Sequence, residues 1–467
     1  MIFLISALDS AVMDANSEAL GTGAAQLMIN AASAVAEVLR ERFPGKRILF
    51  VCGAGNNGGD GIVAAGMMPP DLTEVMLLRP AEDIRSPFVR ESLSKLRCPV
   101  SMFSPRTGFD VLADCALGTG VRGDVREPHR SYILFARAFP GTVVSVDVPS
   151  GLGTDLSVEP HTTITFHDIK EGMNTENSGE IMVKDIGIPN DACLRVGPGD
   201  MLRYPIPLKD SHKGDNGRVL VIGGGAFYGA PALAALAALR VGADIVRIAV
   251  PESSSLLVSS FSPVFVVKEL DGEILSLRHV DYLLNLAEYH DAVVIGPGLG
   301  VAPETVETVK VFVSQCGIPA VVDADGLNAL GNDFKTTGKT ILTPHAGEFE
   351  RLGGNLEDRQ ASASEIARRT GATMLLKGRE DIIADGSHVR INGTGTPAMT
   401  GAGTGDVLSG IVVGLLSKGM SAFDAASLGA YISGKAGEFA FSEFSYGMTA
   451  ADVISFIPKV LREGLRE

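Results

Sequence analysis

The stretch Met399-Thr400-Gly401-Ala402-Gly403-Thr404-Gly405-Asp406 stands directly before an apolar run, Val407–Leu416, that predicts a helix. Its glycines let successive backbone N–H groups point inward, and the N-terminus of the following helix adds positive potential. The stretch therefore predicts an anion-binding loop, in which Asp406 is well placed to take a proton from a hydroxyl that attacks phosphorus. The alternative, an Asp in a first helical turn after a flexible loop, is disfavoured by the glycine-rich context.

Outward from this loop, short apolar runs alternate with helical stretches in both halves of the chain. Continuous apolar strands separated in this way predict mainly parallel sheets that are covered on both faces. A helical layer from Ala11 to Arg40 precedes the strands expected in the first half, which are Arg47–Cys52, Glu74–Leu78, Val111–Cys115 and Thr142–Val148. Helices at Gly403–Leu416 and Ala422–Phe441 follow the strands expected in the second half, which are Arg218–Ile222, Ile245–Val250, Val264–Leu270, Ala292–Ile295, Ala320–Asp323, Thr340–Leu342 and Thr373–Leu376.

A stretch rich in Pro, Gly and charge, between Gly197 and Gly214, separates the two halves. Such a change of texture is typical of a domain boundary. The length of 467 residues also exceeds that of one ordinary domain. The sequence therefore predicts an α/β protein of two tandem three-layer αβα domains, residues 1–203 and 204–467.

The composition excludes several classes of partner and site. The net charge of −15 disfavours general binding to a nucleic acid backbone. The five cysteines are scattered and lack CxxC spacing, which argues against a disulfide framework and a thiolate metal site. The apolar start Met1–Leu8 is too short to span a bilayer and has no basic segment before it. We expect a cytoplasmic protein that binds neither nucleic acid nor membrane.

The first expected strand runs into a glycine-rich turn, Gly53-Ala-Gly55-Asn-Asn-Gly58-Gly-Asp60-Gly, before a helical stretch at Ile62–Met67. Formally this is the dinucleotide-binding fingerprint, but Asp60 would stand where a pyrophosphate normally meets the helix. A carboxylate there repels phosphate, yet it can accept a hydrogen bond from a hydroxyl or bind a cation. A plain glycine turn and an oxidoreductase Rossmann turn remain the alternatives for this segment alone.

Two more strand ends carry carboxylates, Asp114 and Asp147, and the second is followed by Val-Pro-Ser150-Gly. The carboxyl ends of parallel strands line one crevice, so Asp60, Asp114 and Asp147 should converge with Asn57 and Ser150. An oxygen-rich set without His or Cys suits a hard cation. A helix N-cap explains each Asp alone, but three at three strand ends make that explanation poor.

Gly-Asn-Asn-Gly-Gly-Asp-Gly, Asp114 with the later Gly-Thr-Gly, and Val-Asp-Val-Pro-Ser-Gly resemble the YjeF N-terminal domain, a Rossmann-like NAD(P)H-hydrate epimerase. The resemblance spans roughly residues 1–200, and it departs at Met28-Ile-Asn-Ala-Ala32, where the family tends to show Met-Glu-Asn-Ala-Gly. It implies a potassium ion held by Asn57, Asp114 and Ser150. Either Asp60 or Asp147 is a candidate for the acid/base group of this half. The resemblance further implies substrate contacts by Asn56, Asn57, Gly58, Gly59, Asp60, Gly118, Thr119, Gly120, Val121, Arg122, Gly123, Asp124 and Asp147.

Further polar segments follow strands of the second half at Gly223-Gly-Gly225, Gly296-Pro-Gly298-Leu-Gly300, Asp323-Ala-Asp325, Thr343-Pro-His345-Ala-Gly-Glu348 and Lys377-Gly-Arg379-Glu-Asp381. His345 taken alone is more typical of a capping or structural histidine than of a catalytic one. Lys377-Gly378 fits a turn, and beside an anion-binding loop it equally fits a contact to nucleotide phosphate. Each segment lies at the carboxyl end of a strand and should face the same crevice as Asp406.

These segments resemble the YjeF C-terminal domain, the ADP- or ATP-dependent NAD(P)H-hydrate dehydratase of the ribokinase-like superfamily, over about residues 205–460. The resemblance implies hydrate contacts by Ala230, Gly298, His345, Ala346, Gly347, Glu348, Phe349, Glu350, Arg351 and Asp406. It implies adenine nucleotide contacts by Lys377, Gly378, Arg379, Glu380, Asp381, Thr396, Pro397, Ala398, Met399, Thr400, Gly401, Ala402, Gly403, Thr404 and Gly405.

The combined resemblance implies a nicotinamide nucleotide repair enzyme with NADHX or NADPHX and ADP or ATP as substrates. Asp406 would take the proton of the hydrate's hydroxyl as that oxygen attacks the terminal phosphate, with Mg²⁺ on the nucleotide. The released products would be phosphate and AMP or ADP. We also expect a homo-oligomer. The alternative is a small-molecule alcohol kinase whose first half is a non-catalytic nucleotide-binding module.

Overall fold

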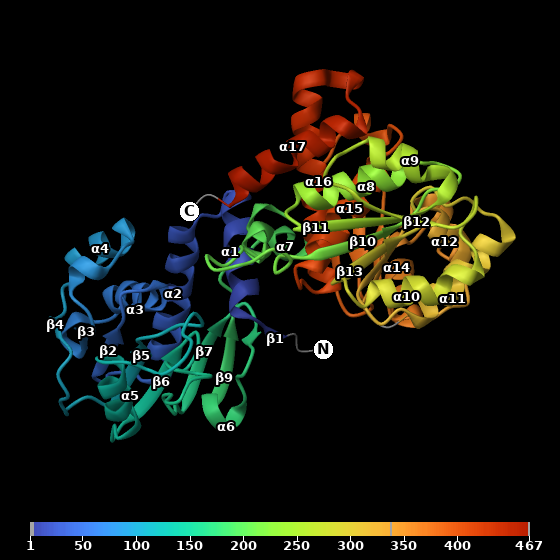
Figure 1. The fold of residues 1–467 in the computed structure, drawn as a ribbon. Helices are drawn as coiled ribbons and strands as arrows, with labels where there is room; N and C mark the ends of the chain where they lie inside the picture. The colour runs from blue at the N-terminus through green and yellow to red at the C-terminus, as the bar shows by residue number, and fades with distance from the viewer. Residues whose placement is uncertain (1–3, 337–338, 466–467) are drawn as a thin grey trace. The chain divides into compact units, whose positions relative to one another are not determined.

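The computed structural model describes residues 4–336 and 339–465, which form two compact units, Met1–Ala192 and Cys193–Glu467 (Figure 1). The sequence placed the boundary later, at 203/204. The difference arises because the intervening segment packs on the second unit. Asp200 accepts a hydrogen bond from the Arg390 guanidinium at 3.0 Å, and the Tyr204 hydroxyl donates to the Val241 carbonyl at 2.9 Å. These partners are remote in sequence, so local composition gave no sign of them.

The first unit is built on a seven-stranded sheet in the order β4-β3-β2-β5-β6-β7-β9, with every neighbouring pair parallel. All four expected strands are present within two residues of their predicted ends. The strands are β2 (Ile48–Cys52), β3 (Thr73–Leu77), β4 (Val100–Met102), β5 (Val111–Cys115), β6 (Thr142–Val146), β7 (Thr162–Phe166) and β9 (Glu180–Lys184), and a separate parallel pair joins β1 (Leu4–Ile5) to β8 (Ile169–Lys170). The sequence missed β4, β7 and β9. The edge strands β4 and β9 are partly exposed, and the inner strand β7 contains three threonines, so none of them is a continuous apolar run.

Helices cover both faces of this sheet (Figure 1). α2 and α3 pack on one face, and α5 packs on the other. The expected N-terminal helical layer consists of two helices, because the chain turns between them at Gly21, which has a φ of 95°. The helices are α1 (Ala7–Ala19), α2 (Ala24–Arg42), α3 (Asn56–Gly66), α4 (Pro87–Ser94), α5 (His129–Arg137), α6 (Thr175–Ser178) and α7 (Asn190–Leu194).

The prediction of a helix at Ile62–Met67 was wrong at its start, because α3 begins at Asn56. The glycine-rich segment is therefore the first turns of a helix, and Asp60 lies on α3 instead of in a loop. The helix can start this close to β2 only with glycine at 58. A Cβ there would lie 1.9 Å from the Gly53 carbonyl oxygen.

The second unit contains a nine-stranded sheet in the order β12-β11-β10-β13-β14-β15-β16-β17-β18. It is parallel from β12 to β16, and β17 and β18 add antiparallel strands that the sequence did not predict. The strands are β10 (Arg218–Ile222), β11 (Ile245–Pro251), β12 (Val266–Leu270), β13 (Ala292–Ile295), β14 (Ala320–Val322), β15 (Thr340–Leu342), β16 (Thr373–Leu376), β17 (Asp381–Ala384) and β18 (Val389–Asn392).

Alternate residues of these strands supply two hydrophobic cores, one on each face of the sheet. Val219 and Val221 belong to the core under α8, α15, α16 and α17, whereas Leu220 and Ile222 belong to the core under α10, α11, α12 and α14. The predicted three-layer αβα arrangement is confirmed. The helices are α8 (Gly229–Arg240), α9 (Glu252–Ser260), α10 (Val280–Ala287), α11 (Pro303–Gln315), α12 (Asp325–Leu330), α13 (Ala346–Arg351), α14 (Arg359–Thr370), α15 (Thr404–Ser417), α16 (Ala422–Phe444) and α17 (Ala450–Gly464).

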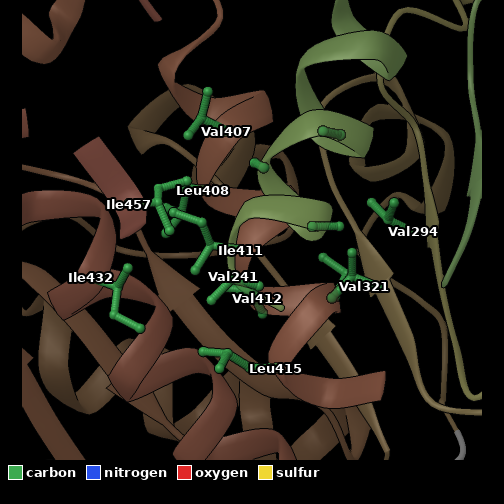
Figure 2. Close-up of a cluster of buried hydrophobic side chains, with 14 of the residues drawn as sticks. Val241, Val294, Val321, Val407, Leu408, Ile411, Val412, Leu415, Ile432 and Ile457 are labelled. Carbon is green, nitrogen blue, oxygen red and sulfur yellow. The ribbon is translucent and has the colours of Figure 1, made fainter. Parts of the chain in front are cut away.

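α15 passes through the middle of the first of these cores, and every residue from Val407 to Ser417 is buried. Figure 2 shows its side chains Val407, Leu408, Ile411, Val412 and Leu415 among side chains of the neighbouring elements. The helix approaches α8 very closely at Gly410, where a Cβ would lie 2.2 Å from the Ala234 carbonyl oxygen. This packing fixes the N-terminal turn of α15, which carries Asp406.

We predict that Gly410→Ala lowers the free energy of unfolding of the second unit by about 1–3 kcal/mol, because the added methyl group must push α15 away from α8. Chemical denaturation, monitored through the hydrogen exchange of the α15 amides, measures the change in the free energy of unfolding. Gly447→Ala is the matched control, since a Cβ at that position meets open space. Equal stability of the two variants would contradict the prediction.

Candidate functional site

The first unit has a cavity of about 840 Å³ at the carboxyl ends of its strands. α1, α2 and α3 contribute to its wall, together with the segments that follow β5 and β6. Of the residues that the sequence assigned to substrate binding, the cavity is lined by Asn56, Asn57, Gly58, Asp60, Gly118, Thr119, Gly120, Val121 and Asp147. The structure therefore brings three separate predicted segments to one cavity.

Four residues of the predicted set do not line this cavity. Gly59 faces α2, where a Cβ would lie 2.8 Å from the Cε atom of Met28. Arg122, Gly123 and Asp124 are exposed in the loop that continues past Val121. Their contact with substrate stays a prediction, and no side chain among them borders the cavity in this structure.

Asp114 lies behind the cavity, fully buried at the end of β5. Its carboxylate accepts hydrogen bonds from the Ser150 amide at 2.9 Å, from the Ser145 hydroxyl at 2.7 Å and from the Tyr132 hydroxyl at 2.9 Å. Burial raises the pKa of Asp114, although these donors oppose that shift. The expected cluster of three aspartates around one cation is wrong, because no group of three His, Cys, Asp or Glu residues in the described ranges could hold a metal ion.

A smaller set of oxygens nevertheless meets beside Asp114. The Asn57 side chain donates to the Leu117 carbonyl at 2.8 Å, while its own Oδ1 atom is buried without a hydrogen-bond partner. The Ser150 hydroxyl lies 2.5 Å from Asp114 Oδ1 and 3.3 Å from the Leu117 carbonyl oxygen. An unsatisfied buried oxygen such as Asn57 Oδ1 is costly unless a cation or a donor completes its interactions. The donor types fit a hard cation.

The ionisable side chains that line the cavity include Asp60, Asp147, Lys170 and one residue that the sequence analysis missed, Asp14 of α1. The Lys170 ammonium lies 3.0 Å from Asp147 Oδ1. Burial, followed by the charges of Asp147 and Asp14, raises the pKa of Asp60 well above its usual value. Burial and then Asp147 raise the pKa of Asp14 to about 6.

The signal for Asp14 was present but weak in the sequence. It is a single acidic residue directly after Val12 and Met13, which are buried. An isolated carboxylate on an amphipathic helix is usually a solvated residue, so the pattern alone gave no reason to single it out. Asp147 has a φ of 63°, an uncommon conformation for a residue other than glycine that occurs often at functional sites.

In the second unit the glycine-rich loop ends at Gly403, whose φ of 89° requires the left-handed region. Asp406 follows in the first turn of α15, a turn whose N–H groups have no acceptor within the helix. Burial raises the pKa of Asp406 to about 7, the charge of Asp323 adds to the shift, and Lys377 opposes it. A carboxyl with such a pKa is suited to take up a proton near neutral pH.

Lys377 stands next to this loop at the end of β16. A Cβ at Gly405 would lie 3.4 Å from the Lys377 ammonium nitrogen. That nitrogen is 3.0 Å from Asp323 Oδ1, which also accepts a 2.8 Å hydrogen bond from the Thr343 hydroxyl. Burial lowers the pKa of Lys377, but the charges of Asp323, Glu348 and Asp406 raise it overall. A charged ammonium thus lies beside Asp406.

The remaining predicted residues of this unit have mixed placements. His345 caps α13 by accepting a 3.0 Å hydrogen bond from the Gly347 amide, as expected for a structural histidine. Gly298 accepts from the Phe227 amide at 3.0 Å and has a φ of 70°. Glu380 forms an ion pair with Arg195, and Asp381 accepts from the Asn392 side chain. Direct contacts of these residues with substrate or nucleotide stay predictions.

A search of the described ranges finds no helix of the length and apolar character needed to cross a membrane.

Each of the two units matches a model of a known protein family. A family model of the YjeF-related protein N-terminus matches residues 24–172, and one of the NAD(P)H-hydrate dehydratases matches residues 219–459. A bifunctional NAD(P)H-hydrate repair enzyme of Pyrobaculum aerophilum is 42% identical, with 98% of each chain covered. One of Methanothermobacter thermautotrophicus is 40% identical, with 99% of this chain and 96% of that one covered.

Among solved structures, the ADP/ATP-dependent NAD(P)H-hydrate dehydratase of Bacillus subtilis, crystallised with ATP and Mg²⁺, has a TM-score of 0.51. It is 25% identical and covers 58% of this chain and 98% of its own length. A ribokinase-like superfamily protein of Enterococcus faecalis has a TM-score of 0.52 at 23% identity and covers 58% of this chain and 96% of its own. The predicted ribokinase-like fold of the second unit is confirmed.

We predict that Asp406→Asn stabilises the second unit at pH 8. The pKa of the native carboxyl is about 7, against 3.8 for an ordinary Asp, so the native state binds the proton more tightly than the unfolded state. Native stability therefore falls as the pH rises from about 4 to about 7 and stays constant above that. The variant should gain about 1–4 kcal/mol at pH 8 and nothing at pH 3. Denaturant titrations at several pH values measure the difference, and a pH-independent difference would contradict the assignment.

Proposed function

The chain belongs to the bifunctional NAD(P)H-hydrate repair enzymes, and we propose that its two sites divide the two reactions between them. The protein is an NAD(P)H-hydrate epimerase and an ADP/ATP-dependent NAD(P)H-hydrate dehydratase. Epimerisation is assigned to the cavity of the first unit and dehydration to the loop before α15. The alternative of an alcohol kinase with a non-catalytic first half is not supported, because relatives similar over both units are bifunctional repair enzymes.

The single observation that carries the dehydratase assignment is Asp406 in the first turn of α15, beside the ammonium of Lys377. Hydroxide is a poor leaving group, so the hydroxyl at C6 of the hydrated ring must be activated. Asp406 takes the hydroxyl proton while the oxygen attacks the terminal phosphorus of ADP or ATP, and the bond from that phosphorus to the nucleotide breaks. AMP or ADP leaves, and C6 now carries a phosphate.

The second stage restores the nicotinamide ring. The N1 lone pair expels phosphate from C6, and loss of a C5 proton then regenerates the double bond of NAD(P)H. The N–H groups of Gly401–Gly405 and the Lys377 ammonium would stabilise the charge that develops on the transferred phosphoryl group. Mg²⁺ bound to the nucleotide phosphates neutralises charge during such a transfer, and the Bacillus subtilis dehydratase was crystallised with ATP and Mg²⁺.

Asp323 fixes the position of the Lys377 ammonium and keeps it protonated. It holds the ammonium at 3.0 Å and is itself held by the Thr343 hydroxyl at 2.8 Å. Because Asp323 is almost fully buried, its charge keeps Lys377 protonated and disfavours ionisation of Asp406. The Lys377–Asp323 ion pair therefore supplies a fixed cation, and the Asp323 charge at the same time contributes to the raised pKa of Asp406.

In the first unit we assign the hydrated nicotinamide to the cavity that Asp60 and Asp147 line. Potassium would be held behind its wall by Asn57 Oδ1, Asp114 and Ser150, where the unsatisfied Asn57 oxygen favours a bound cation. The ion would fix the helix start of α3 relative to the loop after β5, and both segments line the cavity. A cytoplasmic homo-oligomer stays a prediction from the sequence.

We predict that Asp406→Asn lowers the rate of dehydration at least about 100-fold, since the hydroxyl loses its general base. Recovery of NADH absorbance and release of free phosphate measure the rate, and calorimetry should show nearly unchanged ADP binding. In the parent protein kcat/KM should rise with pH through about 7, because the base must be deprotonated. Asp271→Asn, on the surface of the same unit, is the control. Full activity of Asp406→Asn would exclude Asp406 as the base.

We predict that epimerisation depends on K⁺ and that Asn57→Ala removes this dependence, because the variant lacks the unsatisfied oxygen. Epimer exchange is followed by chromatography in KCl and in choline chloride at equal ionic strength. In the parent protein the melting temperature of the first unit should also rise with K⁺ concentration. Asn56→Ala, which removes the neighbouring amide, should retain the K⁺ response. Indifference of the parent protein to K⁺ in both measurements would refute the site.

A further inference from the structure

Three carboxyl groups and one ammonium enter the cavity of the first unit from four different elements. Asp14 comes from α1, Asp60 from α3, Asp147 from the segment after β6 and Lys170 from β8. Among the described residues, Asp147 is the one carboxyl group of the three that forms an ion pair. We therefore distinguish the carboxyl group that has a cationic partner, Asp147, from the two that have none among these residues, Asp14 and Asp60.

Asp147 is the carboxylate that Lys170 neutralises. The Lys170 side chain is nearly fully buried, lies 3.0 Å from Asp147 and also donates to the Phe166 carbonyl at 2.6 Å. The Asp147 amide donates to the Ile164 carbonyl at 2.7 Å, which fixes the backbone. A buried ion pair is costly to break, because the remaining partner is left uncompensated. Lys170 thus holds the Asp147 carboxylate in place, where it is suited to accept a hydrogen bond from substrate.

Asp14 has the opposite surroundings. Within the described part of the chain, no cation lies within ion-pair distance of its carboxyl group, and no hydrogen bond engages that group. It borders the cavity, where it is open to a ligand. Asp60 likewise has no cationic partner, but it lies deeper, where burial and two neighbouring carboxylates favour its protonated form.

We propose that Asp14 is a catalytic acid/base of the epimerase, acting with Asp60 as a proton-exchanging pair, while the Lys170–Asp147 ion pair positions the substrate. The proposal rests on the epimerase function assigned above to this cavity. It revises the choice between Asp60 and Asp147 that the sequence left open, because it adds a residue from a helix that the motif does not include.

The reaction balances when Asp14 and Asp60 together carry one proton. The Asp60 carboxyl protonates the C6 hydroxyl, the C6–O bond breaks, and the N1 lone pair forms a C6=N1 double bond as water leaves. A water then adds to the other face of C6, and Asp14 takes its proton as the new C6–O bond forms and the electron pair returns to N1. Asp60 ends deprotonated and Asp14 protonated, which is the state needed for the reverse conversion. No oxidant or reductant is consumed.

The charged groups around Asp14 set the pH dependence of this pair. Asp60, Asp147 and Lys170 face it across the cavity; His167 also lines the cavity, and burial lowers the pKa of this His. On its own helix Asp9 bonds to Ser6. Arg79 and His129 also line the cavity. Because the pair must hold one proton, kcat/KM should rise as Asp14 ionises, with a pKa of about 6 in the free protein.

The test is epimerisation by the full-length protein with K⁺ and without ADP, starting from the pure R epimer of NADHX and following the S epimer by chromatography. After subtraction of the rate without protein, kcat of Asp14→Asn should be at least about 100-fold lower than that of the parent protein. The rise of kcat/KM near pH 6 should also be abolished. Asp14→Glu should restore part of the rate and shift that rise. The dissociation constant of NADH and the melting temperature should stay at the parent values in Asp14→Asn, which separates catalysis from folding.

Glu18→Gln is the matched control, because it removes one negative charge from an exposed residue one turn further along the same helix that does not line the cavity. It should leave both the rate and the pH profile unchanged. Parent-like epimerisation with the rise near pH 6 in Asp14→Asn would overturn the role of Asp14. Absence of epimerisation in the parent protein itself would instead refute the function assigned to the cavity.

Discussion

The ion pair between Lys377 and Asp323 is the interaction on which the chemistry of the second unit depends. It places a positive charge beside the glycine-rich loop and a buried negative charge close enough to oppose ionisation of Asp406. Without the lysine, the carboxylates at these strand ends would repel one another and any phosphate. Without the aspartate, burial would favour the neutral amine and the loop would lose its nearby cation.

The first unit uses the same arrangement on a different sheet. Lys170 pairs with Asp147 at a strand end, and the neighbouring carboxyl groups of Asp14 and Asp60 are left unpaired with raised pKa values. In both units several carboxyl groups lie near the carboxyl edge of a parallel sheet, and a buried lysine forms an ion pair with one of them. The remaining carboxyl groups gain proton affinity suited to acid and base catalysis near neutral pH.

Much of the fold was predictable because buried parallel strands are continuous apolar runs, as in β2, β13 and β14. The positions of two acidic residues were predictable from local sequence: Asp147 directly follows β6, and Asp406 opens the apolar helix α15 after a glycine-rich loop. Asp14 was missed because its importance comes from neighbours distant in sequence. The same limit applies to the start of α3, where a backbone contact between Gly58 and Gly53, invisible in local composition, moves a predicted loop into a helix.

The central claim is that Asp406 is a base whose pKa is set by burial, by Asp323 and by Lys377. Titration of ¹³C-labelled aspartate carboxyl signals, assigned with Asp406→Asn, measures this pKa in the parent protein and in Lys377→Met. We expect a pKa of about 7 in the parent protein and a higher pKa once the ammonium is removed. A pKa near the ordinary 3.8 that does not respond to the loss of Lys377 would contradict it.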